Sequence, residues 1–247
     1  MQTALVEASA IRDRKDYPMR LRVKFRKYGP VRFIGHLDVM RFFQKAIRRA
    51  EIDIAYSGGF SPHQIMSFAQ PLSVGLESNG EYMDIEVNSY NSCNDIMNRL
   101  NAASAPGLEV TSVIELPEKA GNAMASVAAA SYTVRFREGR EPSVDIEQVL
   151  PAFLAKEQIL YSKETKKGIR EIDLKAGIYD LKWQNNTFTM LVDASSAGNI
   201  KPVQIIEALL QYNGEALQEN ALFVTREDTF TNIGTAEKPD FVPLNEV

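Results

Sequence analysis

The sequence is poor in the residues that hold redox centres and metal ions. Its 247 residues include one cysteine, Cys93, and two histidines, His36 and His63. A single cysteine excludes a disulfide within the chain, and also a four-cysteine zinc site or three-cysteine iron–sulfur motif supplied by this chain alone. We expect Cys93 to be a small buried apolar residue. We also expect the protein to carry no metal or cofactor of its own.

Long apolar runs are lacking as well. No stretch approaches the ~20 residues that a membrane span needs, and residues 1–18 carry charges where a signal peptide would be apolar. We therefore expect a cytoplasmic protein with no membrane partner. The chain is longer than an average domain of about 150 residues, which favours two small domains.

The charges are unevenly distributed along the chain. Residues 1–50 hold 13 of the 28 basic residues but only four of the 32 acidic ones, which makes this segment strongly positive within an acidic protein. A net charge of −4 therefore does not exclude an anionic partner.

Hydrophobic periodicity predicts the order β-α-β-β-α-β in the first half of the chain. Residues 19–26 alternate in the manner of a strand, and residues 36–50 have apolar residues at helical spacing. A short apolar run at 52–56 precedes the later elements. These are strands at 67–74 and 82–87, a helix at 91–103 and a strand at 108–116.

The second half repeats this scheme with one or two extra strands. Strands are predicted at 132–136, 158–162, 170–174, 179–183, 187–192 and 221–226, and helices at 144–155 and 202–212. The fold class is therefore α+β, with two tandem ferredoxin-like (βαββαβ) domains whose antiparallel sheets carry helices on one face. The expected boundaries are an extension at 1–18, domains at 19–117 and 131–230, a linker at 118–130 and an irregular tail at 231–247.

The opening strand has one basic face. If its apolar residues point to the helices, its cations stand on the opposite, open face of the sheet and suit a phosphate backbone, RNA above all. Arg135 and Arg137 resemble this pattern in the second half. Alternatively, Asp84 and Glu86 on a neighbouring strand explain the charges through cross-strand ion pairs. The cations of this face are Arg20, Arg22, Lys24 and Arg26.

Both histidines lie in segments typical of functional sites. His36 begins a predicted helix within RFIGHLD at 32–38, where unpaired N–H groups can hold an anion. His63 ends the loop YSGGFSPH at 56–63. Together they could supply a general acid and base. Alternatively, His36 caps its own helix and His63 is an exposed loop residue without a role.

The second half contains a third candidate. The polar turn at 195–202 leads into a helix, a geometry that favours anions, with Lys201 nearby. The alternative is an ordinary helix start capped by Asn199 or Ser196. The segment REID at 170–173 adds Arg170.

The motifs RFIGHLD, GFSPH at 59–63, PLSVGLES at 71–78 with EYMDIE at 81–86, REID and GNIKP at 198–202 resemble the radical SAM-linked protein family. The resemblance extends over about residues 19–228. It implies a companion of a radical SAM enzyme, encoded beside it or fused to it, with no characterised activity of its own. It also implies that residues 1–18 are an extension. Gln64 and Ile65 depart from the family, which has a proline and a basic residue there.

A more distant, fold-level similarity is to CRISPR repeat-processing endoribonucleases. We therefore expect an accessory protein that binds or presents the substrate of a radical SAM enzyme, with RNA as the candidate. One alternative is a metal-independent endoribonuclease that uses His36 and His63. Another is a small anionic ligand bound in a deep pocket between the two domains. The candidate binding residues are Arg20, Arg22, Lys24, Arg26, Arg32, His36, Arg41, Tyr56, Ser57, Gly59, Phe60, His63, Arg170, Asn199 and Lys201.

Overall fold

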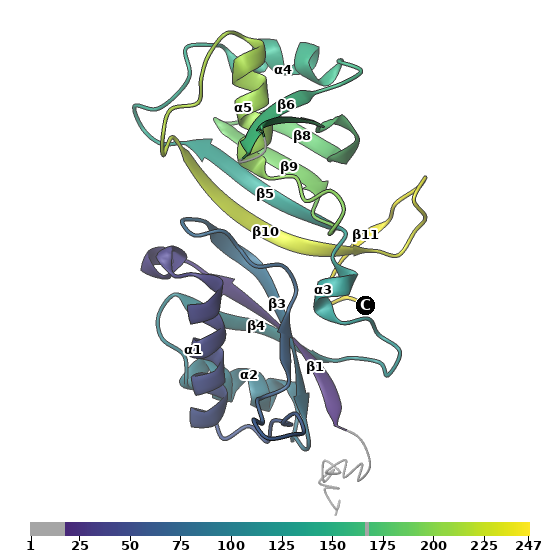
Figure 1. Ribbon diagram of the computed structural model, residues 1–247. Coiled ribbons are helices and arrows are strands. Elements are labelled where there is room, and N and C mark those ends of the chain that lie inside the picture. Colours follow the sequence, from purple (N-terminus) through teal and green to yellow (C-terminus); the bar gives the residue numbers. More distant parts are fainter. Residues whose placement is uncertain (1–17, 166–167) are drawn as a thin grey trace, which may run out of the picture.

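The computed structural model describes residues 18–165 and 168–247 and has a mixed α/β fold around one large sheet (Figure 1). The predicted extension lies outside these residues except for its last position. The first half contains β1 (Met19–Lys27), the short 3-10 helix η1 (Gly29–Phe33), α1 (His36–Arg49), β2 (Met66–Phe68), β3 (Glu77–Val87), α2 (Cys93–Ala102) and β4 (Leu108–Glu115).

The second half follows a short helix in the predicted linker, α3 (Ala123–Ser126). Its elements are β5 (Ala129–Phe136), α4 (Ile146–Leu154), β6 (Leu160–Thr165), β7 (Gly168–Asp173), η2 (Lys175–Gly177), β8 (Ile178–Gln184), β9 (Thr187–Asp193), α5 (Pro202–Tyr212), β10 (Leu222–Asn232) and β11 (Phe241–Pro243). The predicted extra strands are β6 and β7, which form a separate two-stranded sheet.

Strands from both halves join into a single sheet of nine strands. Its order is β4-β1-β3-β10-β5-β9-β8, with β2 paired to β3 and β11 to β10. All of these pairs are antiparallel except β3–β10, where Thr225 lies opposite Glu77 and Arg226 opposite Ser78. Gly80 permits this close approach, because a Cβ atom there would lie 2.6 Å from the Asp228 Cα. The two halves are thus joined by backbone pairing between strands β3 and β10.

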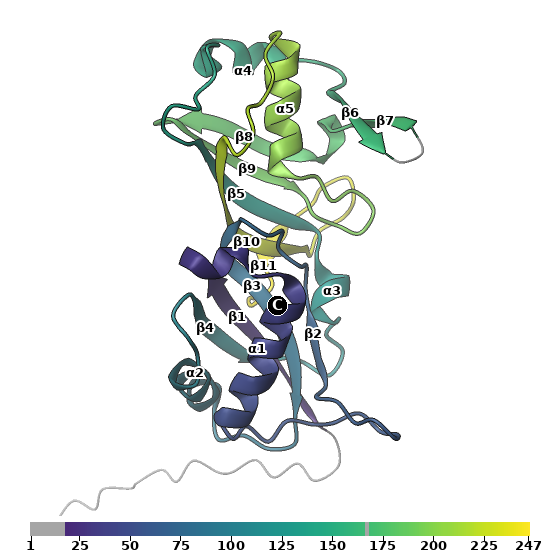
Figure 2. The same ribbon diagram turned by 60° about the vertical axis from the view of Figure 1, so that its left-hand side comes forward.

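Each half nevertheless has its own hydrophobic core. In the first, α1 and α2 pack on the sheet face formed by Leu21, Val23 and Phe25, and Cys93 is half-buried at its margin. In the second, α4 and α5 cover β5, β8 and β9 (Figure 2). Leu21 and Phe25 are at most 1% exposed, as the alternation of the opening strand predicts.

Three predicted elements differ from the structure. Residues 52–56 form only isolated bridges, at Ile54 and Tyr56, and the strand predicted at 67–74 ends at Phe68. Pro71 interrupts this segment, and a proline lacks the N–H that a strand ladder needs. The expectation of a wholly irregular tail is also wrong, because β11 pairs with the end of β10.

The prediction of an open basic face on β1 is wrong. The predicted linker and the C-terminal segment cover this face beside α3 (Figure 1). Arg22 is 1% exposed and forms a two-pronged ion pair with Asp84, with nitrogen–oxygen distances of 2.8 and 3.0 Å. It also donates to the carbonyls of Leu244 and Gly121. The alternative, an ion pair between neighbouring strands, is therefore confirmed for Arg22.

The other cations of this face also have partners within the chain. Lys24 contacts Asp228 of β10 at 2.6 Å. Arg26 pairs with Glu109 at 3.2 Å and bonds to Asn79. Arg20 donates to the carbonyls of Pro117 and Ala120. Arg22 and Lys24 are therefore held in ion pairs largely away from solvent, and the open basic face predicted on β1 does not exist in this form. Arg20 and Arg26 stay partly exposed.

Replacing Arg22 by methionine should lower the free energy of unfolding by about 3–5 kcal/mol, because the buried Asp84 carboxylate would lose its partner. Arg26→Met is the matched control. Its ion pair is about half exposed, so a loss below ~1 kcal/mol is expected. Urea denaturation of both variants measures the difference. Equal losses would contradict a structural role for the buried pair.

Candidate functional site

His36 is the first residue of α1 and lies near the junction of the two halves. Its ring meets Phe68 edge-on, with centroids 5.1 Å apart, and it lines a small cavity with Lys27, Gln70 and Glu81. The cavity volume is about 10 Å³, enough for one water molecule at most. Arg32 is not among its lining residues. The prediction of a deep inter-domain pocket for a small anionic ligand is therefore wrong for this cavity.

Burial changes the protonation of the groups around this cavity. It lowers the pKa of His36, which favours the neutral imidazole. Burial also lowers the pKa of Lys27, against the attraction of Glu81, while its ammonium donates to the Ile34 and Arg32 carbonyls. Burial raises the pKa of the Glu81 carboxyl, and its ion pair with Arg226, at 3.0 Å, opposes this shift. The cluster therefore holds η1 and the β3–β10 junction in place.

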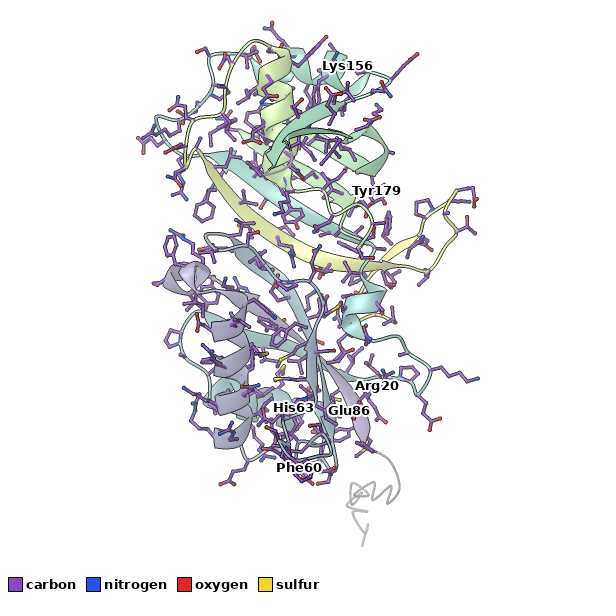
Figure 3. The ribbon with its side chains drawn as sticks, in the orientation of Figure 1. Arg20, Phe60, His63, Glu86, Lys156 and Tyr179 are labelled. Atoms are coloured by element: carbon purple, nitrogen blue, oxygen red, sulfur yellow. The ribbon has the colours of Figure 1, made fainter. Side chains whose placement is uncertain are left out.

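The loop at 56–63 lies at the other end of the first half. Phe60 and His63 are at the bottom of Figure 3, away from the β3–β10 junction. The Ser57 hydroxyl lies 2.8 Å from the His63 Nδ1 and also accepts from the His63 N–H. Gly59 has a φ of 96°, a conformation suited to glycine. His63 is exposed, and its position is fixed by its own loop.

The two histidines do not share a cleft. His36 contacts Phe68, whereas His63 precedes Phe68 by five residues of mostly extended chain, roughly 16 Å at about 3.3 Å per residue. The cavity at His36 has no contribution from His63. A general acid and base must both reach one substrate. The hypothesis that His36 and His63 act as such a pair stays a prediction, which the lining of this cavity does not support.

Exposed cations lie along one side of α1. Arg41, Lys45 and Arg48 recur at helical spacing on the outer face of α1, and all three are exposed. Arg41 approaches Asp38 at 3.5 Å, with both side chains more than 60% exposed. Among the side chains that the structure describes, no carboxylate lies within ion-pair distance of Lys45 or Arg48. We call these three cations the α1 surface.

The glycine loop carries two exposed aromatic rings, and its base contacts α1. Tyr56 is 51% exposed, and Phe60 is fully exposed. Tyr56 pairs with Gln64, whose amide donates to the Gln44 carbonyl of α1 at 3.3 Å. Gln64 is one of the two departures from the family motif, and here it fixes the base of the loop to the helix.

The predicted anion turn before α5 is occupied by the chain's own carboxylate. Asp193 accepts from the Ser195 N–H at 2.7 Å, and a Cβ atom on Gly198 would lie 1.9 Å from an Asp193 oxygen. Asn199 accepts from Gln70 at 3.0 Å and thereby links the turn to the first half. Lys201 is exposed at the start of α5. The turn therefore has a structural role, and its anion site was predicted wrongly.

Arg170 lies in β7 opposite Lys163, but its side chain falls outside the described part of the structure. Its predicted role in binding stays a prediction.

Sequence reasoning noted Arg135 and Arg137 but missed the ring that joins them to Arg32. Phe223 of β10 lies directly opposite Arg135 of β5. The guanidinium carbons of Arg135, Arg32 and Arg137 lie 4.8, 5.3 and 5.5 Å from the centre of the Phe223 ring. Arg32 also stacks on Phe33 at 4.8 Å. We call these five residues the arginine–phenylalanine cluster. The alternation of Arg135 and Arg137 was the one available signal.

Comparison with known proteins places the chain in a family. Residues 20–202 match a family described as "Uncharacterized protein conserved in bacteria (DUF2344)", and the chain belongs to that family. No curated protein matches the chain. Among the helices described, none has the length and apolar character needed to cross a bilayer. Over the same residues, no group of three or more His, Cys, Asp and Glu side chains could hold a metal ion.

The lowered pKa of His36 should make stability depend on pH. Below the ordinary value of 6.5 the unfolded chain binds a proton that the folded chain resists, so stability falls as the pH drops through about 6.5. His36→Gln removes this contribution. The free energy of unfolding, measured by urea denaturation between pH 7 and pH 5, should therefore fall less steeply in the variant. Identical slopes would contradict a half-buried His36 that resists protonation.

Proposed function

We propose that this protein is a non-catalytic companion of a radical SAM enzyme in the cytosol, and that it presents RNA to that enzyme. The motifs shared with the radical SAM-linked family support the choice of partner. The α1 surface supports the choice of ligand, and it is the observation that carries the proposal. The α1 surface is the candidate RNA-binding surface instead of the β1 face, whose cations pair with carboxylates of the same chain.

The charges of the α1 surface favour a phosphate backbone. Arg41, Lys45 and Arg48 form a row along one side of the helix, with Asp38 as the only acidic residue of α1. Each cation that neutralises a phosphate releases counterions, whatever the base sequence. Because Lys45 and Arg48 have no carboxylate partner among the residues described, they give up no internal ion pair when they bind.

The exposed aromatic rings of the glycine loop favour an unpaired strand. Unstacked bases of single-stranded RNA bind on exposed aromatic side chains, at about 1–3 kcal/mol for each base. Phe60 and Tyr56 are exposed on a loop fixed to α1 through Gln64. Rings and cations together are the combination that single-strand readers use. An ordinary solvated helix face does not require the exposed rings.

We also propose that each half is a ferredoxin-like unit. The strand orders β4-β1-β3-β2 and β10-β5-β9-β8 support this, because in each half the first and third strands are central and adjacent. The hairpin β6–β7 is then an insertion in the second unit. A tandem arrangement leaves the outer face of α1 uncovered by the second unit, which the proposed RNA contact requires.

Replacing Arg41, Lys45 and Arg48 together by glutamine should weaken binding of a single-stranded RNA at low salt. The slope of log affinity against log salt should fall by about 2, because ~0.7 of a counterion is released per phosphate of a single strand. Phe60→Ala should weaken binding roughly tenfold through lost stacking. Fluorescence anisotropy with a labelled oligouridylate measures both effects.

The matched control is the triple glutamine variant of Lys119, Lys182 and Lys238, which are exposed cations elsewhere on the chain. It should bind as the unchanged protein does. Equal losses in the two triple variants would contradict a specific α1 surface. A tagged full-length protein recovered from native cytosol tests the partner. Recovery of neither a radical SAM protein, identified by mass spectrometry, nor RNA would overturn the proposal.

A further inference from the structure

The arginine–phenylalanine cluster brings cations of both halves to one spot. Arg32 comes from η1 in the first half, whereas Arg135, Arg137 and Phe223 come from the ends of β5 and β10. Glu77 at the start of β3 fixes η1 here, because one of its oxygens accepts from the Gly29 N–H at 2.9 Å and from Arg32 at 3.1 Å. The cluster is therefore built on the sheet and does not depend on a free loop.

The charges of the cluster are not balanced within the molecule. Glu77 compensates Arg32, but no carboxylate in the described ranges lies within ion-pair distance of Arg135 or Arg137, and both are exposed. A side-chain hydrogen bond of Arg137 runs from its Nε to the Leu222 carbonyl and does not use its two outer nitrogens. Two guanidinium groups held near one ring repel each other, so an anion between them would be stabilised.

The shape of the cluster indicates what kind of anion it accepts. A guanidinium stacked on a ring is held in one plane, and its N–H fork matches two oxygens of a phosphate. Phe33 is 61% exposed and stacks on Arg32 through one face only among its described contacts. The exposed ring of Phe33 suits a planar base, and the exposed forks of Arg135 and Arg137 suit a phosphate. A simple carboxylate such as glutamate or acetate could bind the guanidinium groups but would leave the exposed ring of Phe33 without a partner.

We propose that the arginine–phenylalanine cluster is a binding site for a nucleotide unit, with the phosphate held by Arg135 and Arg137 and the base stacked on Phe33. The unit can be a free mononucleotide or part of an RNA strand. The site is separate from the α1 surface and does not rest on the partner proposed above.

Isothermal titration with uridine monophosphate, uridine and inorganic phosphate at low salt tests the ligand. Uridine monophosphate should bind at least about tenfold more tightly than either of its parts, since stacking and charge each contribute. A 5′-phosphorylated octauridylate, followed by anisotropy, distinguishes the sources. Competition by the mononucleotide indicates a free ligand, and retention of the octamer against it indicates a strand. Either result supports the site only where Arg135→Gln/Arg137→Gln weakens that binding, because octamer that this variant still holds is bound at the α1 surface.

The variant Arg135→Gln/Arg137→Gln should weaken uridine monophosphate binding at least about tenfold, and Arg135→Lys/Arg137→Lys should restore it only in part, because lysine has no fork. Phe33→Ala should weaken binding of the mononucleotide but not binding of inorganic phosphate. Arg140→Gln is the matched control, because this arginine bonds to Gln218 and not to the ring. Thermal melting confirms folding of each variant.

Two results would overturn the site. One is the absence of uridine monophosphate and octamer binding by the unchanged protein. The other is unchanged binding of both ligands by the folded Arg135→Gln/Arg137→Gln variant. The α1 triple variant separates the two proposals, since it should weaken the octamer at most and leave the mononucleotide unaffected.

Discussion

The fold depends on keeping the guanidinium group of Arg22 satisfied away from water. An isolated buried charge is strongly unfavourable, so this residue needs a carboxylate at ion-pair distance and further acceptors for its remaining N–H groups. Asp84 supplies the first, and the carbonyls of Gly121 and Leu244 supply the others. The Asp84 carboxylate in turn accepts from the Ala123 N–H at 2.7 Å. One ion pair thereby holds two covering segments against the sheet.

This arrangement determines which positive charges remain available for function. The cations of β1 are held by partners within the chain: they bond to Asp84, to Asp228 and to backbone carbonyls. Groups of exposed cations lie on the outer side of α1 and around Phe223. An acidic protein can thus present two confined positive surfaces. The strongly basic first 50 residues therefore do not form one continuous basic face, because the cations of β1 and those of α1 lie on different sides of the sheet.

Much of the fold could be predicted from local patterns, because side-chain period fixes which face of a strand or helix is buried. Alternation placed Leu21 and Phe25 in the core and Asp84 opposite the basic strand. What covers the other face could not be predicted, since backbone carbonyls leave no signature in the sequence. The parallel β3–β10 pair could not be predicted either, because it forms through backbone groups of strands far apart in the sequence. The separation of His36 from His63 likewise depends on how long the extended chain between them runs.

The contact between Arg22 and Leu244 spans 222 positions of the chain. Strand β10, which shields the inner edge of β3, is likewise made long after its neighbour. During synthesis at about 5–20 residues per second, the first half therefore waits several seconds without the Leu244 carbonyl that Arg22 bonds to and with an unpaired strand edge. Such an edge is a template for pairing with other chains. The nascent chain is therefore most vulnerable to association before its last strands leave the ribosome.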